Sequence, residues 1–274
     1  PITFDNWNNS KILAYWKYDD ATKLGKDSHS WLGRLNNIRT ALQGQQGDRR
    51  LRLGIAGGEW KKMMADATAR TRFASEVKKI IEQYDFDGVD FDFEWPANAS
   101  EYNNYSATVI QMRSTLGKYV YFTASLHPVS FKISPEAIDA LDFISYQCYG
   151  PAVMRFPYEQ FVKDGEAAVA YGIPKNKLVM GVPFYGSTGS LIAAYCDFVN
   201  DGLATTNEDT YTYKGNTYTF NSIETIRKKA RYVCEEDYAG IMSWDLATDI
   251  DITNNKSLLK VIKEEFEYYA NPTE

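Results

Sequence analysis

The sequence lacks the features that mark metal-binding, membrane-spanning and nucleic-acid-binding proteins. Its three cysteines have no CxxC spacing, which disfavours a zinc or redox site. We expect them to be small buried side chains, although a disulfide between Cys196 and Cys234 stays open; the third is Cys148. No run of about 18 apolar residues occurs, so we expect no membrane partner. Lys and Arg number 30 against 36 Asp and Glu, without a basic stripe, which argues against nucleic acid.

What the sequence does contain is typical of a folded globular protein. The chain has 274 residues, of which 44% are hydrophobic and 24% charged, so disorder, collagen-like repeats and coiled coils are excluded. This length suits two ordinary domains or one α/β barrel. Aromatic residues reach 15%, enough to fill a core or to offer flat faces to a ligand such as a sugar. Because the chain begins at Pro1, we expect that an export signal has been removed or was never included.

Short runs of β-branched and aromatic residues alternate with amphipathic helices, which is the pattern of a parallel sheet built from βαβ units. The predicted strands are 11–16, 51–57, 86–95, 119–126, 141–149, 177–185 and 239–246, with the terminal segment 1–4 as a candidate eighth. Helices are predicted where apolar residues recur every three or four positions, around 32–42, 73–84, 105–116, 223–233 and 258–266.

The spacing of these strands favours one closed barrel. Most strand starts lie roughly 20 to 36 residues apart, near the length that a strand, a crossover helix and the return require. No linker interrupts them, so we predict a single catalytic domain over residues 1–274 with the α/β fold of a TIM (β/α)8 barrel; a doubly wound open sheet is the alternative. The long gap before the last strand includes 210–220, which predicts a hairpin around Lys214, Gly215 and Asn216 at one mouth of the barrel.

The most informative segment runs from Phe86 to Pro96. Because side chains alternate along a strand, Asp90, Asp92 and Glu94 share one face. The opposite face is apolar and suits packing against helices, which leaves the acids inside the barrel near its carboxyl-terminal mouth. That apolar face consists of Val89, Phe91 and Phe93. Ionised acids about 6 to 7 Å apart repel one another, so we expect at least one to hold a proton near neutral pH, as a general acid requires.

Two other interpretations of the acidic face are open. The acids could be satisfied by Arg, Lys or backbone partners in an ordinary half-buried strand, although three acids at this spacing are much rarer than two. They could also bind calcium or magnesium, because clustered carboxylates bind hard cations. Calcium loops need turns, whereas this segment predicts a stiff strand, so we expect no metal and no cofactor.

Segment 87–94 reads DGVDFDFE and resembles the DGxDxDxE signature of glycoside hydrolase family 18. Trp95 and Pro96, which follow it, resemble the chitinase members of that family. Four further segments support the resemblance: 55–58 resembles the SxGG element, 147–149 lies where the MxYD element falls, and 177–186 and 240–244 resemble the seventh and eighth strands. The first strand is degenerate or missing by this comparison, with 11–16 resembling either the first or the second.

The resemblance implies a mechanism without a protein nucleophile, in which the N-acetyl group of the substrate does that work. Glu94 would be the general acid and then the base that activates water. Asp92 would stabilise the positive oxazolinium ring, and Asp90 would trade a proton with Asp92 as a coupled pair. Tyr149 would hold the acetamido oxygen, and Trp244 would form the apolar floor under the sugar ring, with an ordinary core tryptophan as the alternative.

Three elements depart from the family pattern. Ile55 replaces the serine of SxGG and cannot hydrogen-bond the inner aspartate, so proton sharing is expected to be tuned differently. Gln147 and Gly150 replace the methionine and aspartate of MxYD. The missing aspartate removes a contact to the sugar, while Gln147 with Tyr149 resembles a plant-type or endo-acting branch. Ser187 follows the seventh strand where many members carry arginine.

The residues after the seventh strand predict a shallow, open groove. Many members insert a sizeable α+β domain there, whereas only 187–222 is available here, enough for a hairpin. Four aromatic residues are predicted to stack on sugar or else to pack in the core: Trp16, Trp60, Trp95 and Tyr185. Gly58, Gln147 and Trp244 complete the predicted substrate-binding set. His127 is left out, because a lone histidine is more often structural.

The predicted function is retaining, substrate-assisted endo-hydrolysis of β-1,4-linked N-acetylglucosamine polymers, so the expected partner is chitin or a chitooligosaccharide. One alternative is an endo-β-N-acetylglucosaminidase that cuts N-linked glycans. A second is a non-catalytic, lectin-like barrel, and the presence of Glu94 favours catalysis over it. From the substrate class we expect a secreted or extracellular protein, and we expect a monomer.

Overall fold

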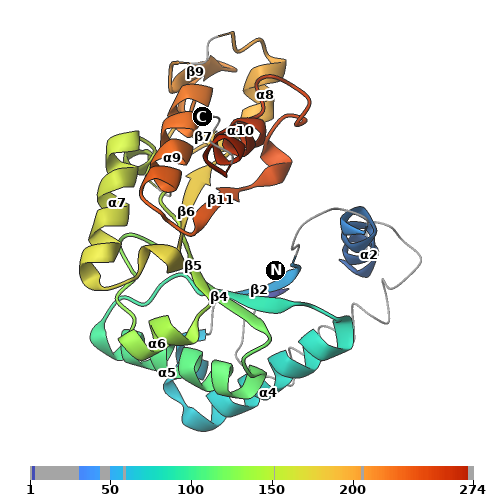
Figure 1. The fold of residues 1–274 in the computed structure, drawn as a ribbon, viewed down its shortest axis with the longest axis vertical. Coiled ribbons are helices and arrows are strands. Elements are labelled where there is room, and N and C mark those ends of the chain that lie inside the picture. The colour runs from blue at the N-terminus through green and yellow to red at the C-terminus, as the bar shows by residue number, and fades with distance from the viewer. Residues whose placement is uncertain are drawn as a thin grey trace. The chain divides into compact units, whose positions relative to one another are not determined.

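The computed structural model describes residues 2–3, 31–43, 50–57, 60–150, 152–204 and 207–270. They fall into two compact units, one formed by Pro1–Ala124 with Ile133–Asp142 and the other by Ser125–Lys132 with Phe143–Glu274 (Figure 1). The candidate strand at 11–16 lies outside the described residues. The single domain over 1–274 stays a prediction.

The first unit is built on parallel strands in the order β1-β2-β3-β4. Their bounds are β1 Ile2–Thr3, β2 Arg52–Ala56, β3 Gly88–Asp92 and β4 Tyr121–Leu126, of which β4 belongs to this unit as far as Ala124. The terminal segment 1–4, the candidate eighth strand, therefore contains a strand at Ile2–Thr3. The register places Gly54 of β2 and Thr123 of β4 on either side of Asp90 in β3.

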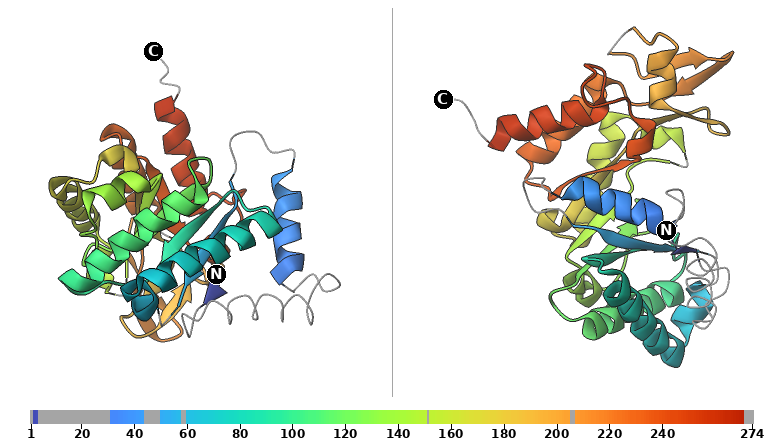
Figure 2. Two further views of the ribbon diagram at one scale, coloured as in Figure 1. Left: turned by 90° about the horizontal axis from the view of Figure 1, so that it is seen from below. Right: turned by 90° about the vertical axis from the view of Figure 1, so that its right-hand side faces the viewer.

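Helices of the first unit supply the apolar layer against these strands. They are α3 Trp60–Ala65, α4 Ala67–Tyr84, α5 Ala99–Leu116 and α6 Pro135–Ala140. The helix α2 Trp31–Leu42 also belongs to this unit, and most of its described side chains are exposed. The two longest, α4 and α5, lie side by side across the strands (Figure 2). Each begins at a side-chain cap that satisfies an otherwise unpaired amide: Asp66 accepts from Ala69 N, and Asn98 accepts from Glu101 N. The predicted helices around 32–42, 73–84 and 105–116 are confirmed.

The second unit contains three parallel strands and a smaller antiparallel sheet. The parallel strands follow the order β5-β6-β11, with bounds Phe143–Tyr146, Leu178–Pro183 and Gly240–Trp244. The antiparallel sheet has the order β8-β7-β10-β9, with β7 Tyr185–Ser187, β8 Ile192–Ala194, β9 Thr210–Tyr213 and β10 Asn216–Thr219. Its helices are α7 Tyr158–Tyr171, α8 Tyr195–Asn200, α9 Ile223–Glu235 and α10 Leu258–Ala270. Short 3-10 turns occupy Val153–Arg155, Lys175–Lys177 and Leu246–Thr248.

The predicted hairpin is the β9–β10 pair. Its two turn residues, Lys214 and Gly215, have φ values of 48° and 76°. Positive φ at both central positions is the geometry of a type I′ turn, whose twist matches that of the flanking strands. The residues between β6 and α9 thus form a small sheet with one short helix, α8, which agrees with the predicted absence of a large inserted domain.

Candidate active site

Strand β3 carries the acidic residues, and burial alternates along it as the sequence predicted. Val89, Phe91 and Phe93 are fully buried, whereas Asp90 and Asp92 are half-buried. The strand ends at Asp92, and Glu94 follows in an exposed position just beyond it. The aspartates therefore share the face opposite the apolar residues, and Glu94 stands at the carboxyl end of the same segment.

The buried face of β3 is fixed by contacts between aromatic rings. The ring of Phe91 lies 4.8 Å from that of Phe122, 5.1 Å from that of Phe93 and 5.8 Å from that of Phe73 in α4. Close-packed rings leave little room for the strand to rotate or slide. This packing holds the acidic face in place from behind.

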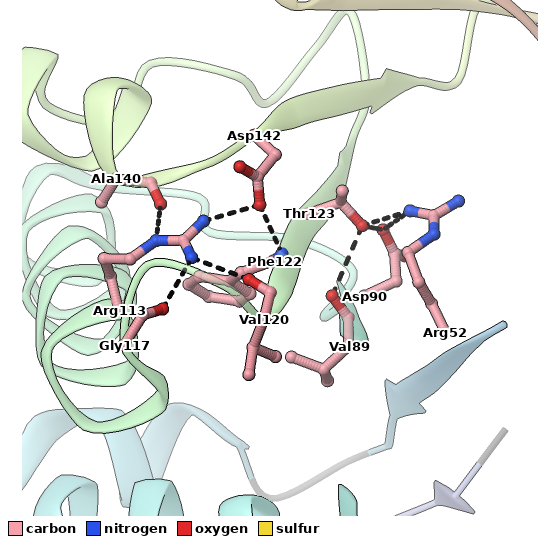
Figure 3. Close-up of polar contacts among 10 residues, drawn as sticks. All are labelled: Arg52, Val89, Asp90, Arg113, Gly117, Val120, Phe122, Thr123, Ala140 and Asp142. Carbon is pink, nitrogen blue, oxygen red and sulfur yellow. Dashed lines mark hydrogen bonds and ion pairs between the residues drawn. The ribbon is translucent and has the colours of Figure 1, made fainter. Parts of the chain in front are cut away.

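Asp90 is contacted from the strands on both sides of β3 (Figure 3). Arg52 Nη1 of β2 lies 3.4 Å from Asp90 Oδ1 and also donates to Thr123 Oγ1 of β4. Thr123 Oγ1 in turn donates to Asp90 Oδ1 and lies 3.5 Å from the carbonyl of Val89. The sequence analysis missed Arg52 and Thr123, because no single strand reveals which residues its neighbours bring beside it.

Tyr105 is a second residue that the sequence analysis did not place at the site. It was assigned to the apolar face of its helix, and it is indeed fully buried, beside Trp60. Its hydroxyl has no hydrogen-bond partner among the described residues. Burial raises the pKa of Tyr105 well above its usual range, and the negative charges of Asp90 and Asp92 raise it further. The tyrosine is therefore a permanently neutral hydroxyl within electrostatic reach of both aspartates.

Trp60 is a core residue, which agrees with the second of its two predicted roles. Only 3% of it is exposed, and its ring packs 5.8 Å from Phe93 and 6.2 Å from Tyr105. It has no free face for a sugar, because α3 turns the indole into the apolar layer. Trp95 is half-buried, so its role stays a prediction. Gly58 and Trp16 lie outside the described residues.

Ile55 lies on the apolar side of β2. It is fully buried and pairs in register with Phe91, whereas Gly54 pairs with Asp90. Residues in register on neighbouring strands share a face, so Ile55 points away from the aspartates. The departure from the family serine therefore puts no apolar side chain against Asp90.

Tyr149 belongs to the second unit and lies in an aromatic cluster with Phe156 and Tyr185. Its ring is 6.5 Å from that of Tyr185, which lies 5.6 Å from that of Phe156, and both pairs are edge-on. The Tyr149 hydroxyl donates to Met242 Sδ at 3.4 Å. A thioether is a weak acceptor, so a carbonyl oxygen would be a better partner for this hydroxyl.

Tyr185 serves this cluster rather than a surface. It is 9% exposed, and burial raises its pKa to about 12. It packs against two neighbouring aromatic rings, which agrees with core packing, the second of its two predicted roles. Trp244 differs: it is 50% exposed at the end of β11, so it is not an ordinary core tryptophan. Its role under a sugar ring stays a prediction.

Gly150 leaves room for the hydroxyl of Tyr185. Its φ is 20°, and a Cβ built on it would lie 2.7 Å from the hydroxyl oxygen of Tyr185. The aspartate expected from the family pattern would require that hydroxyl to move. The departure at this position is thus coupled to the presence of Tyr185.

His127 holds the backbone that carries Tyr149 and Gly150. It is 2% exposed, and its Nε2 lies 2.6 Å from the carbonyl oxygen of Gly150 and 3.2 Å from that of Tyr149. Its Nδ1 accepts from the amide of Val129 at 3.2 Å. These partners assign the proton of the neutral ring to Nε2. The histidine is structural, as the sequence analysis assumed when it left this residue out.

The remaining predicted positions of the second unit are buried. Gln147 is 7% exposed, and its backbone N–H donates to the carbonyl of Leu126. Ser187 Oγ accepts from the amide of Gly189 at 2.9 Å. All three cysteines are free thiols, so no disulfide joins Cys196 to Cys234.

Within the described ranges, no group of three or more His, Cys, Asp or Glu side chains could hold a metal ion. The helices of the same ranges include none that is both long and apolar enough to cross a bilayer.

Comparison with known proteins gives a consistent result. Residues 4–249 match the family described as glycosyl hydrolases family 18. The "Probable chitinase 2" of Drosophila melanogaster is 23% identical over 297 residues, which cover 79% of this chain. The GH18 chitinase ChiB of Flavobacterium johnsoniae is 25% identical, with a TM-score of 0.71 over 85% of this chain and 79% of that one. A chitinase from Bacteroides thetaiotaomicron is 22% identical, with a TM-score of 0.73 over 96% and 94% of the two chains.

These matches confirm the predicted fold class, an α/β fold of the TIM (β/α)8 barrel type. The aligned region spans 60% of the length of the Drosophila relative. Since the family match covers most of the 274 residues, the chain belongs to glycosyl hydrolases family 18.

Proposed function

We propose that this chain hydrolyses β-1,4-linked N-acetylglucosamine polymers, with retention of configuration and with the substrate's own acetamido group as nucleophile. One observation carries the proposal: the DGVDFDFE segment forms a strand whose aspartates share one face and whose last acid, Glu94, is exposed just past the strand end. A general acid needs access to the glycosidic oxygen, and the exposed position of Glu94 supports this role.

In the proposed reaction, Glu94 gives its proton to the glycosidic oxygen while the acetamido oxygen attacks the anomeric carbon. Positive charge develops on the oxazolinium ring, where Asp92 stabilises it as the nearer carboxylate. The leaving sugar departs with the proton. Glu94 then takes a proton from water, the water oxygen attacks the same carbon, and the ring opens to restore the acetamido group. Two inversions at one carbon give net retention.

The other roles in the proposal rest on the family resemblance. Asp90 trades a proton with Asp92, Tyr149 holds the acetamido oxygen and Trp244 supports the sugar ring. The proposed partner is a chitooligosaccharide or chitin. We further propose a single domain, a monomer and a secreted or extracellular location, the last from the substrate class.

The test is turnover of soluble chitooligosaccharides by the wild type and by Glu94→Gln, with Glu82→Gln as the control. Glu82 lies on α4 with 60% of its side chain exposed, so the control makes the same chemical change away from the acids. We expect Glu94→Gln to lower kcat by about 10²- to 10⁴-fold and the control to leave it unchanged.

Each alternative function gives a different result in the same assay. Binding without cleavage by the wild type would establish the lectin-like function. Cleavage of a glycoprotein but not of chitooligosaccharides would establish the N-glycan activity. Anomer analysis at early times is the check on mechanism: β-anomer is expected, and initial α-anomer would contradict assistance by the acetamido group.

A further inference from the structure

Arg52 reaches the acidic face of β3 through a gap in the neighbouring strand. Residues 52, 54 and 56 of β2 share one face, and Gly54 is the register partner of Asp90. A glycine places no side chain beside the aspartate. The long side chain of Arg52, two residues earlier on the same face, extends into that space and brings Nη1 to 3.4 Å from Asp90 Oδ1.

Thr123 completes the contact from the other side of β3. It is fully buried and pairs in register with Asp90. Its hydroxyl accepts from Arg52 Nη1 and donates to Asp90 Oδ1, so guanidinium, hydroxyl and carboxylate form a closed triangle (Figure 3). Both donors act on the same carboxylate oxygen. That arrangement restrains rotation of the carboxylate about its last side-chain bond.

The charge of this contact is permanent. A guanidinium stays protonated throughout the pH range in which enzymes work, whereas a hydroxyl adds no charge. The Arg52 and Asp90 side chains are 28% and 17% exposed, so water screens the pair only in part. A serine partner, which the family pattern expects near the inner aspartate, would supply a hydrogen bond without this charge.

We propose that Arg52 is a positioning residue for the acidic triad: with Thr123 it fixes the Asp90 carboxylate and, through its charge, sets the pH range in which the triad works. This inference rests on the proposed function, because it assigns Arg52 a role through Asp90 in that reaction. In this proposal Arg52 acts through Asp90 and not on a reacting atom. It contacts Asp90 by an ion pair that the Thr123 hydroxyl supports.

The experiment compares pH profiles of kcat on a chitooligosaccharide for the wild type, Arg52→Met, Arg52→Lys and Thr123→Val. Arg72→Met is the matched control, since Arg72 is exposed on α4. Arg52→Met removes the cation that contacts Asp90, and a nearby cation favours the ionised form of a carboxyl group, so we expect the profile to move upward by about one pH unit. It should also lower the maximum of kcat by about tenfold through lost orientation.

The other variants separate charge from geometry. Arg52→Lys keeps the cation and should keep the position of the profile while lowering its height. Thr123→Val removes only the neutral hydroxyl and should behave like Arg52→Lys. Arg72→Met should match the wild type in both respects. Thermal melting of every variant shows which are folded. If Arg52→Met does not fold, the test is made with Arg52→Lys and Thr123→Val.

Two results would overturn the inference. If the wild type cleaves the substrate and the Arg52 and Thr123 variants keep both the position and the height of its profile, Arg52 positions nothing. If the profile of Arg52→Lys shifts as far as that of Arg52→Met, charge does not set the pH range. A wild type that cleaves no chitooligosaccharide would instead overturn the proposed function, and this inference with it.

Discussion

The acidic strand of the first unit and the tyrosine cluster of the second solve the same problem with different forces. Asp90 is held by charge and by directional donors from two neighbouring strands, Arg52 and Thr123. Tyr149 is held by edge-on ring packing against Tyr185, which packs on Phe156. A carboxylate needs polar partners when it leaves water, whereas a phenol can be placed by its apolar ring. Each of these two predicted site residues is therefore held through the part of its side chain that costs the least free energy to bury: hydrogen-bonded oxygens for Asp90 and the apolar ring for Tyr149.

A buried lysine stands behind the tyrosine cluster. Lys229 of α9 is fully buried, and its Nζ donates to the carbonyl of Phe156 at 2.6 Å and to Asn221 Oδ1 at 2.7 Å. Asn221 Nδ2 donates to the same carbonyl at 2.9 Å. The backbone of Phe156 is therefore fixed by two polar side chains while its ring supports Tyr185. The second unit thus also uses hydrogen bonds, but they hold the backbone of Phe156 and do not contact Tyr149 directly.

The largest expected effect on activity concerns the aspartates of β3. Asp92→Asn removes the negative charge that the proposed mechanism places against the oxazolinium, and we expect kcat/KM to fall by about 10²- to 10³-fold. Asp139→Asn is the control in the same unit, since Asp139 is exposed on α6 and lies outside the acidic segment. Steady-state kinetics on a chitooligosaccharide measure both. A loss of less than tenfold would mean that charge on β3 is not what the reaction uses.

On the aromatic side, Phe156→Ala tests packing. The side chain is 1% exposed, so its truncation should lower the free energy of unfolding by about 3–5 kcal/mol. Met154→Ala, at a position 70% exposed in the same loop, should change it by less than about 0.5 kcal/mol. Urea unfolding gives both values. Equal small effects would show that the cluster is not held by ring packing.

Lys229 is expected to make the free energy of unfolding depend on pH. Burial lowers its pKa from 10.5 to about 7. Between pH 7 and 10 the unfolded lysine therefore binds more protons than the folded one, so this residue makes the free energy of unfolding rise with pH, by at most about 1.4 kcal/mol per unit. Below pH 7 both forms are protonated and the dependence disappears. The effect of burial is partly opposed by four neighbouring groups whose charges raise the pKa of this amine: Cys148, Asp209, Asp164 and Glu159.

Urea unfolding of the wild type and Lys229→Met at pH 6, 7, 8 and 9 measures this slope. The difference between them should stay constant from pH 6 to 7 and then move in favour of the wild type. Lys228→Met, at the adjacent exposed position of α9, should show no such trend. A difference that is flat up to pH 9 would show that the buried amine keeps its ordinary pKa.

The smallest effect is expected for Tyr149→Phe. It removes one neutral hydroxyl and leaves the ring packing intact, so kcat/KM should fall by about tenfold with the free energy of unfolding unchanged within about 0.5 kcal/mol. Kinetics and urea unfolding together check this. Loss of stability without loss of activity would place the hydroxyl in the core instead of the reaction.

Sequence reasoning succeeded where a local period decides the structure. The alternation along β3, the helices α4, α5, α9 and α10, and the β9–β10 hairpin all follow from patterns within one segment. It could not decide where burial depends on distant residues. Trp60 and Tyr185 were each predicted either to stack on sugar or to pack in the core, and their neighbours in space bury them.

The missed polar contacts have a related cause. Arg52 and Thr123 meet Asp90 only because three strands pair in a particular register, and register is a property of the sheet rather than of any strand. The helix α7 also went unpredicted, although it spans 14 residues. Its buried positions include Asp164 and Gly165 among the apolar ones, which breaks the hydrophobic period.

The fit between Gly150 and Tyr185 constrains how these two positions can change. A Cβ at position 150 would lie 2.7 Å from the Tyr185 hydroxyl oxygen, so an acidic side chain there requires that hydroxyl to shift. A shorter side chain at position 185 would remove this contact. A mutant library that varies positions 150 and 185 together therefore samples combinations that the present packing disfavours one at a time.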